Sequence, residues 1–190
     1  MTPSFSCLRN HFLISMPHLH DQNFSQTVTY LCDHSEYGAM GLVVNRPVGI
    51  ALSELCDHLN LPCSSVANQQ QEIYSGGPIH GDRGYVLHKA ISPIEWPSSH
   101  CIADDIYITT SIDAIEAAAE GHFNHNYLIA LGCACWSPGQ LEQEMADNVW
   151  LSCLANSDIL FGIPAGDRLQ AAASTLGVNL DLLTAHTGHA

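Results

Sequence analysis

The stretch NYLIALGCACWSPGQ, residues 126–140, decides the fold. Its first eleven residues are apolar on both faces, which is typical of a strand buried on both sides within a sheet. Ser137, Pro138 and Gln140 then match an N-cap, a proline in the first helical turn and a Gln three residues after the cap, so we expect a helix to begin at Ser137. Its apolar face would carry Leu141, Met145 and Val149. A central strand that runs directly into a helix therefore frames the domain.

Short strands and fewer helices surround this unit. Strands are predicted at residues 11–16, 27–33, 39–45, 72–75, 84–89, 105–110 and 150–154, and helices at 51–61, 111–120 and 165–176. The tight turn SEYG predicts an antiparallel hairpin between the second and third strands, and Pro47 and Ser92-Pro93 are expected to end strands. The fold class is therefore α+β, a single domain with a mixed, largely antiparallel sheet packed with helices. Residues 1–10 are expected to be a flexible tail and residues 11–190 the domain.

The charge balance excludes one class of function. The 190-residue chain has 5 Lys and Arg against 19 Asp and Glu, a formal net charge of -14. Nucleic-acid binding draws on lysines and arginines that release counterions from phosphates, and few are present. We expect no direct binding to DNA or RNA.

The cysteines and the hydropathy pattern indicate a compartment. Most of the 8 cysteines lie in or beside apolar segments, where a free thiol packs as a small hydrophobic group. The FLISM run is too short for a signal sequence, and no stretch approaches the ~18 apolar residues of a membrane span. We expect a cytoplasmic protein with reduced thiols and no membrane association.

The most conspicuous motif is SGGPIHGDRGYVLH, residues 75–88, with four glycines and an Asp82-Arg83 pair. Glycine loops that hold phosphate normally run from a strand into a helix, whose N-terminus faces the anion. A short β-prone segment follows here instead, so the stretch is read as strand, loop, strand. This context excludes the common nucleotide-binding loops, and the loop is interpreted as a turn whose glycines permit positive φ and close backbone approach.

Two arginines are candidate ligand-binding residues because the chain has so few cations. Arg46 follows Asn45, and Arg83 follows Asp82 in the glycine loop, so each could clamp an anion. The alternative, which we favour, is that both arginines form structural salt bridges that fix loops.

Metal and nucleophile chemistry receive less support. The pairs His18-x-His20, His122-x-x-His125 and Cys133-x-Cys135 invite a zinc interpretation, but structural zinc normally takes four ligands at recognised loop spacings. We expect no metal and no cofactor. A Cys/His nucleophile pair stays open, although nothing in the sequence selects its members. Glu142 and Glu144 are two residues apart on a helix and so would not face each other as a catalytic pair.

Several blocks together resemble the AlgH/YqgE-like family of uncharacterised bacterial proteins: FLISMPHLHDQNF, TVTYLCDHSEYGAMGLVVNRP, SGGPIHGDRGYVLH, LGCACWSPGQLEQEMADNVWL and the terminal GHA. The resemblance implies a compact α+β fold with a bifurcated, folded-over sheet, and no established reaction. It carries over the motif positions Asn45, Arg46, Gly76, Gly77, Pro78, Asp82, Arg83, Gly84, Trp136, Gly139, Gln140 and Glu142. This chain departs from the family pattern at Cys133 and Cys135, where tyrosine and glycine are usual.

Two functions follow as hypotheses. The first is a non-enzymatic regulatory or adaptor protein that acts through a protein partner or a small anionic ligand, with at most an indirect effect on transcription. The second is a small-molecule enzyme or metabolite sensor with an anion site at Arg46, Arg83 and the Gly76-Gly77 loop. The candidate ligand-binding residues are Asn45, Arg46, Gly76, Gly77, Asp82, Arg83, Trp136 and Gln140.

Overall fold

The computed structural model describes residues 6–91 and 96–185. Its strands form one sheet in the order β10-β1-β2-β3-β9-β6-β8-β7, with β4 and β5 branching from β9. The strands are β1 (His11–Ser15), β2 (Val28–Ser35), β3 (Gly38–Val43), β4 (Pro47–Ala51), β5 (Glu72–Ser75), β6 (Ile79–Lys89), β7 (His100–Ala103), β8 (Ile106–Thr109), β9 (Tyr127–Trp136) and β10 (Trp150–Leu154). Pairing between described strands is antiparallel except between β5 and β9, which confirms the mixed, largely antiparallel sheet.

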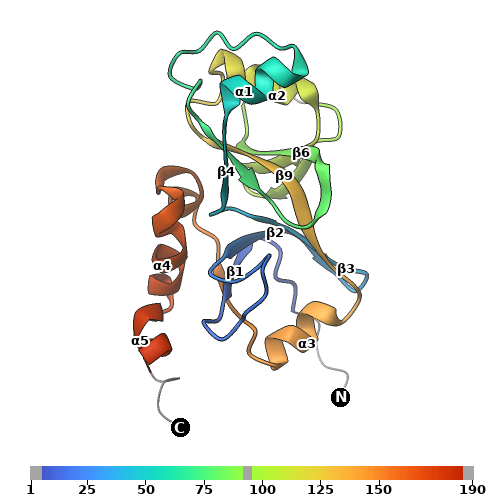
Figure 1. Ribbon diagram of the computed structural model, residues 1–190. Coiled ribbons are helices and arrows are strands. Elements are labelled where there is room, and N and C mark those ends of the chain that lie inside the picture. The colour runs from blue at the N-terminus through green and yellow to red at the C-terminus, as the bar shows by residue number, and fades with distance from the viewer. Residues whose placement is uncertain (1–5, 92–95, 186–190) are drawn as a thin grey trace.

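The sheet divides at Gly132, in the middle of β9. Residues 129–131 of β9 pair with β5, whereas residues 134–136 pair with β3 on the same edge, and β6 occupies the other edge. Gly132 has φ 74°, a left-handed conformation that suits glycine and interrupts the strand's alternation. The bifurcation that the family resemblance implied is therefore present, and Figure 1 shows β9 running from the α1 and α2 end of the molecule toward α3.

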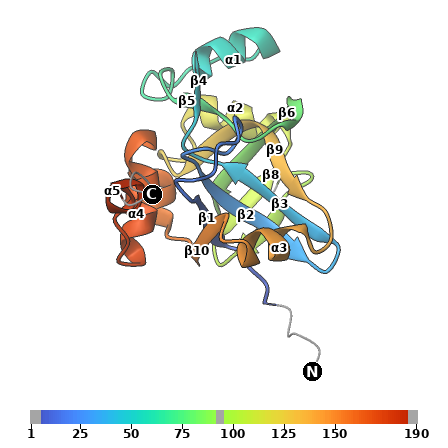
Figure 2. The same ribbon diagram turned by 60° about the horizontal axis from the view of Figure 1, so that its bottom comes forward.

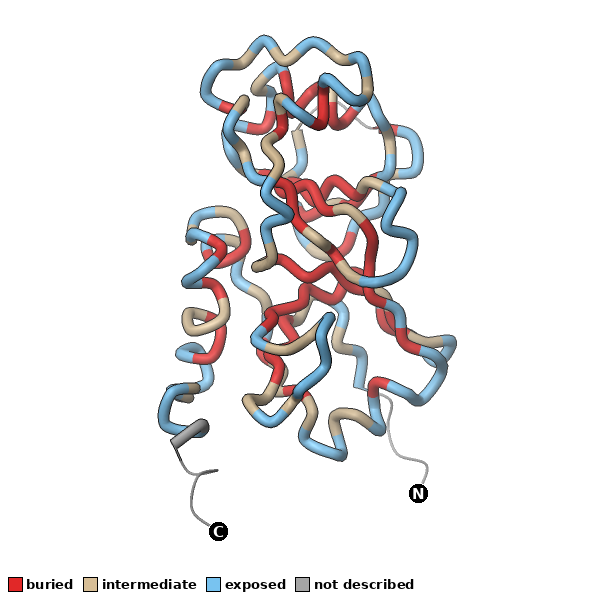
Figure 3. The backbone as a smooth tube through the Cα atoms, in the orientation of Figure 1, coloured by how far each residue is buried: buried red, intermediate tan, exposed pale blue. Residues whose placement is uncertain are grey.

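Helices cover the sheet at three places: α1 (Leu52–Leu59) and α2 (Ile112–Glu120) at one end, α3 (Gln140–Ala146) at the other, and α4 (Ala165–Thr175) and α5 (Leu180–Ala185) along one side. Figure 2 shows the last two from a second direction. A buried core lies beneath each group, and β9 contributes to all three, for example Ile129, Cys133 and Trp136. Figure 3 shows these buried residues concentrated along the sheet. β9 is therefore apolar on both faces because both faces pack in buried cores, as the sequence predicted.

Several element boundaries differ from the prediction. The helix expected at Ser137 begins at Gln140, because Gly139 adopts φ 76° and separates the Ser137 turn from the helix. Only half of the capping box forms: the Ser137 N–H donates to Gln140 Oε1 at 3.0 Å. β4 was missed because Pro47 was taken only as a stop, yet proline is tolerated as the first residue of an outer strand. The sequence analysis also missed β7, α5 and a π-helical segment at Asp158–Gly162.

The segment expected to be a tail is described from residue 6. Within it, the Leu8 N–H donates to His34 Nδ1 at 2.9 Å. The Asn10 N–H donates to a β2 carbonyl, its side chain accepts the hydroxyl of Tyr30 in β2, and its carbonyl accepts the N–H of the residue after β10. The rest of that segment, the Ser92-Pro93 break and the terminal GHA lie outside the described residues.

Candidate functional site

The glycines of the conspicuous loop serve a close crossing of three chain segments. A Cβ atom at Gly76 would lie 2.2 Å from the carbonyl oxygen of Gly132, and one at Gly77 would lie 2.3 Å from the carbonyl carbon of Cys133. Gly76 also links both branches of the sheet, because its N–H donates to Leu131 and its carbonyl accepts from Val43. These two residues therefore act at the fork itself.

The second half of the loop bulges out of β6. The pairing of β6 with β9 jumps from Ile79 to Gly84, which leaves four exposed residues outside the ladder. Asp82 and Arg83 belong to this bulge, and Arg83 reaches a cavity whereas Asp82 is not among the residues lining it.

That cavity has a volume of about 540 Å³ and is called here the arginine cavity. Arg9 and Arg83, two of the chain's five lysines and arginines, both line it, together with one acid, Asp33. Neither arginine belongs to the ion pairs found in the described part of the chain, which join His34 to Glu142 and His122 to Glu120. Its lining consists of Arg9, Cys32, Asp33, Met40, Arg83, Tyr85, Ser98, His100, Cys101, Ile102, Ile108, Thr109 and Thr110.

The chemistry of this lining favours binding of an anion. Two guanidinium groups supply fixed forks of N–H donors, and the Ser98 and Thr110 hydroxyls and the His100 ring add further polar atoms. Burial raises the pKa of Tyr85 to about 12, and burial likewise raises the pKa of the Cys32 thiol. The cavity's phenol and this thiol are therefore protonated at neutral pH.

Arg46 and Asn45 lie elsewhere and hold a loop. Arg46 Nη1 donates to the carbonyl oxygens of Gln22 and Asn23, and its Nη2 donates to that of Ser25, all at 2.7 Å. The Asn45 amide accepts from the Val28 N–H and donates to the Gln26 carbonyl. The structure therefore does not bring Arg46 and Arg83 to one cavity. Arg46 fixes a loop, as the sequence analysis favoured, but it does so through backbone carbonyls and, within the described residues, not through the expected salt bridge.

Trp136 and Gln140 line a separate cavity of about 310 Å³, called here the aromatic cavity. Its other lining residues are Leu19, Asp21, Phe24, Cys135, Glu144, Val149 and Trp150. Sequence reasoning missed Phe24, Glu144 and Trp150, although the two tryptophans flank the α3 helix in the chain. It also missed Arg9, because nothing in the sequence distinguishes that residue from an ordinary tail residue.

The cysteine pair has one buried and one exposed member. Cys133 and Cys135 place their sulfur atoms 3.7 Å apart, and the Tyr85 hydroxyl donates to Cys133 Sγ at 3.4 Å. Burial and the neighbouring Cys133 raise the pKa of Cys135 to about 11. Within the described ranges, no group of three or more His, Cys, Asp or Glu residues is arranged to hold a metal ion. No helix in that part of the chain is long and apolar enough to cross a membrane.

Fold and cavities together define a class: a single-domain α+β protein whose forked sheet carries one basic and one acidic aromatic cavity. Comparison with known proteins places the chain more narrowly. It matches the AlgH-like (DUF179) family over residues 12–181, and it belongs to that family.

Relatives and solved structures agree with this assignment. The chain is 50% identical to the UPF0301 protein AlgH of Pseudomonas aeruginosa, over 96% of each chain, and 45% identical to a UPF0301 protein of Chromohalobacter salexigens, over 96% of this chain and 98% of that one. The solution structure of Pseudomonas aeruginosa AlgH superposes with a TM-score of 0.77 at 47% identity, covering both chains fully. A crystal structure from Corynebacterium diphtheriae shares the fold alone, with a TM-score of 0.73 at 18% identity over 96% and 94% of the chains.

Proposed function

We propose that this protein is a non-enzymatic regulatory or adaptor protein that binds a small organic anion in the arginine cavity and acts through a protein partner. One observation carries the proposal: in a chain with net charge -14, Arg9 and Arg83 converge on one cavity from separate parts of the sequence. Guanidinium groups recognise carboxylate and phosphate through paired hydrogen bonds. The cavity volume lies within the range of roughly 300–1,000 Å³ that is usual for small-molecule sites.

The surroundings support binding over catalysis. Nucleophilic catalysis needs an activated thiol or hydroxyl. Burial holds the Cys32 thiol and the Tyr85 phenol in their protonated forms, so neither of these two groups is activated. The acidic surface opposes direct contact with nucleic acid, so an effect on transcription would pass through another protein. A cytoplasmic location is part of the same proposal.

The test is calorimetric titration with inorganic phosphate, organic acids, nucleotides and phosphorylated metabolites. Arg9→Gln and Arg83→Gln are each expected to weaken the best anion at least tenfold. The matched control is Lys89→Gln, which removes one positive charge from the same strand as Arg83 but outside the cavity. No binding up to about 10 mM across the panel, or equal loss in the Lys89 control, contradicts the proposal. Turnover of a bound anion that Arg83→Gln abolishes would replace the binding protein with an enzyme.

A further inference from the structure

The aromatic cavity is lined by three aromatic rings and two carboxylates. Phe24, Trp136 and Trp150 lie with ring centroids 5.6–6.2 Å apart, and Trp150 is nearly perpendicular to each of the other two. The cavity of about 310 Å³ opens among these rings, and Glu144 and Asp21 are its acidic residues. No lysine or arginine lines it.

The Glu144 carboxylate is held by neutral donors. Its Oε2 accepts the indole N–H of Trp136 at 2.9 Å and that of Trp150 at 2.8 Å, and its Oε1 accepts the Gln140 amide at 2.9 Å. These three bonds fix the carboxylate, and Glu144 belongs to neither of the ion pairs found among residues 6–91 and 96–185. Both indoles turn their N–H edges toward Glu144 and are largely buried, with 5% of Trp136 and 3% of Trp150 exposed. The faces of aromatic rings carry the negative side of the quadrupole.

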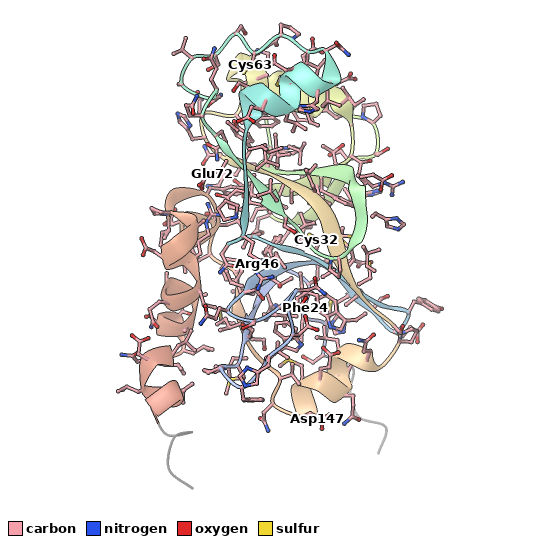
Figure 4. The ribbon with its side chains drawn as sticks, in the orientation of Figure 1. Phe24, Cys32, Arg46, Cys63, Glu72 and Asp147 are labelled. Carbon is pink, nitrogen blue, oxygen red and sulfur yellow. The ribbon has the colours of Figure 1, made fainter. Side chains whose placement is uncertain are left out.

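The third ring is fixed in advance. Asp21 Oδ1 accepts the N–H groups of Asn23 and Phe24 at 2.7 and 3.1 Å. Arg46 then ties the same loop to the sheet through its three carbonyl contacts, and Figure 4 labels Phe24 and Arg46 in this part of the molecule. Arg46 is therefore a positioning residue for the aromatic cavity, and little ordering is needed when a ligand enters.

We propose that the aromatic cavity binds an organic cation of the ammonium or guanidinium class. A cation near aromatic faces is attracted by the ring quadrupoles, and this attraction grows when the site excludes water. The Glu144 charge at the wall adds a specific ionic partner, and the net charge of -14 steers cations to the protein. This site is separate from the arginine cavity and has the opposite charge preference.

Two sources can supply this chemistry: a free metabolite, or a Lys or Arg side chain on a basic segment of a protein. The probes are choline and arginine amide, with citrulline amide as the control that has arginine's shape without the guanidinium charge. The α-amino groups of both amides are acetylated, so that arginine amide carries one positive charge and citrulline amide carries none. A short peptide whose one charged group is a central arginine distinguishes the two sources. Tighter binding of the peptide than of arginine amide assigns the site to a protein side chain, and equal or weaker binding assigns it to a free cation.

The readout is the indole N–H signals in a ¹H–¹⁵N correlation spectrum. The chain has 3 tryptophans, and Trp96 is an internal control because it packs in the core beneath α1 and α2. Arginine amide or choline is expected to shift the Trp136 and Trp150 signals saturably, to leave Trp96 unchanged, and to bind at least tenfold more tightly than citrulline amide.

Variants locate the charge. Glu144→Gln is expected to weaken the cation at least tenfold, whereas Asp147→Asn, which removes the same charge from the exposed end of α3, is expected to leave affinity unchanged. Phe24→Leu supplies a second test that retains Glu144 and its donors, and it is expected to weaken binding severalfold. The proposal is overturned by indole signals that do not move at 20 mM probe, by equal binding of citrulline amide, or by unchanged affinity in folded Glu144→Gln. If Glu144→Gln does not fold, Phe24→Leu is the deciding variant. Unchanged affinity in Phe24→Leu also overturns the proposal.

Discussion

Gly76→Ala tests whether the glycine loop is architectural. The added Cβ would lie 2.2 Å from the Gly132 carbonyl oxygen, where ordinary contact begins near 3.4 Å, so β5 and β9 must separate by about 1.2 Å. That movement strains two hydrogen bonds of 2.8 Å, from the Gly76 N–H to Leu131 and from the Val43 N–H to the Gly76 carbonyl. Each is worth about 1 kcal/mol, and overpacking adds roughly 1–3 kcal/mol. We expect a loss of about 3–5 kcal/mol.

Urea unfolding measures this loss. At a slope of roughly 3 kcal/mol per molar, the midpoint should fall by about 1 M or more. Gly81→Ala is the control within the same loop, because no atom lies within 4 Å of its Cβ and its backbone φ is not positive, and we expect it to stay within about 0.5 kcal/mol of the parent. Equal midpoints for Gly76→Ala and Gly81→Ala would refute the idea that the close approach to Gly132 requires glycine at position 76. A role of the loop in ligand binding would then be the better interpretation.

Three further outcomes are expected. Arg168 is buried, donates to the carbonyls of Ile163 and Val44, and lies 5.1 Å from the Tyr74 ring centroid. Arg168→Met should therefore lower the free energy of unfolding in urea by about 3 kcal/mol. A loss below about 1 kcal/mol would contradict these contacts. Burial lowers the pKa of His88 below its ordinary value of 6.5, so the unfolded chain binds this proton at a higher pH than the folded protein does. Stability should therefore fall as pH drops below 6.5. The free energy of unfolding of His88→Phe should fall less than that of the parent between about pH 7.5 and 5.5. The pKa of Cys135 is raised from 9.0 to about 11, so at pH 7 it has about a hundredfold less thiolate than a cysteine of ordinary pKa. Mass spectrometry should show slow iodoacetamide labelling of Cys135, with a rate that rises about tenfold per pH unit. Fast labelling at pH 7 would refute this.

Local patterns predicted the elements that local chemistry determines. The 126–136 strand, the SEYG hairpin and the helix after residue 111 needed only hydrophobic periodicity and turn residues, and the structure confirms them. The helix start at Ser137 was wrong by three residues because the pattern of cap residues did not reveal the left-handed conformation of Gly139. β4 was missed for a similar reason: whether a proline ends a strand or begins an outer one depends on the neighbouring strand.

The glycine pairs show the limit of such patterns. The sequence indicated that Gly76 and Gly77 allow close backbone approach, but the segment they approach, Gly132 and Cys133, lies more than fifty residues later in the chain. Only the forked pairing of β9 brings those segments together. A pattern of glycines therefore predicted a geometric need and not the partner that creates it.

The arginines show why the candidate site could not be assembled from sequence. Arg46 and Arg83 have equivalent local settings, each after a polar residue at a turn. Arg46 donates to three backbone carbonyls and so has a structural role. Arg83 lies in the bulge outside the β6–β9 ladder and lines a cavity that Arg9 also lines. The sequence analysis was right that Glu142 and Glu144 do not face each other, since one bonds His34 and the other bonds the two indoles.

The two cavities are nevertheless connected through one strand. Cys135 lines the aromatic cavity, and its sulfur lies 3.7 Å from that of Cys133, which accepts the hydroxyl of Tyr85 in the wall of the arginine cavity. In a chain with only 5 Lys and Arg, two of these line one cavity and none lines the other, so the two cavities differ in charge. β9 lines only the aromatic cavity and touches the wall of the other through the contact of Cys133 with Tyr85. Gly132 interrupts the alternation of the strand, so that Cys133 packs in one core whereas Trp136 packs in another. The left-handed glycine therefore lets one strand place Cys133 beside the wall of the arginine cavity and Cys135 and Trp136 in the wall of the aromatic cavity.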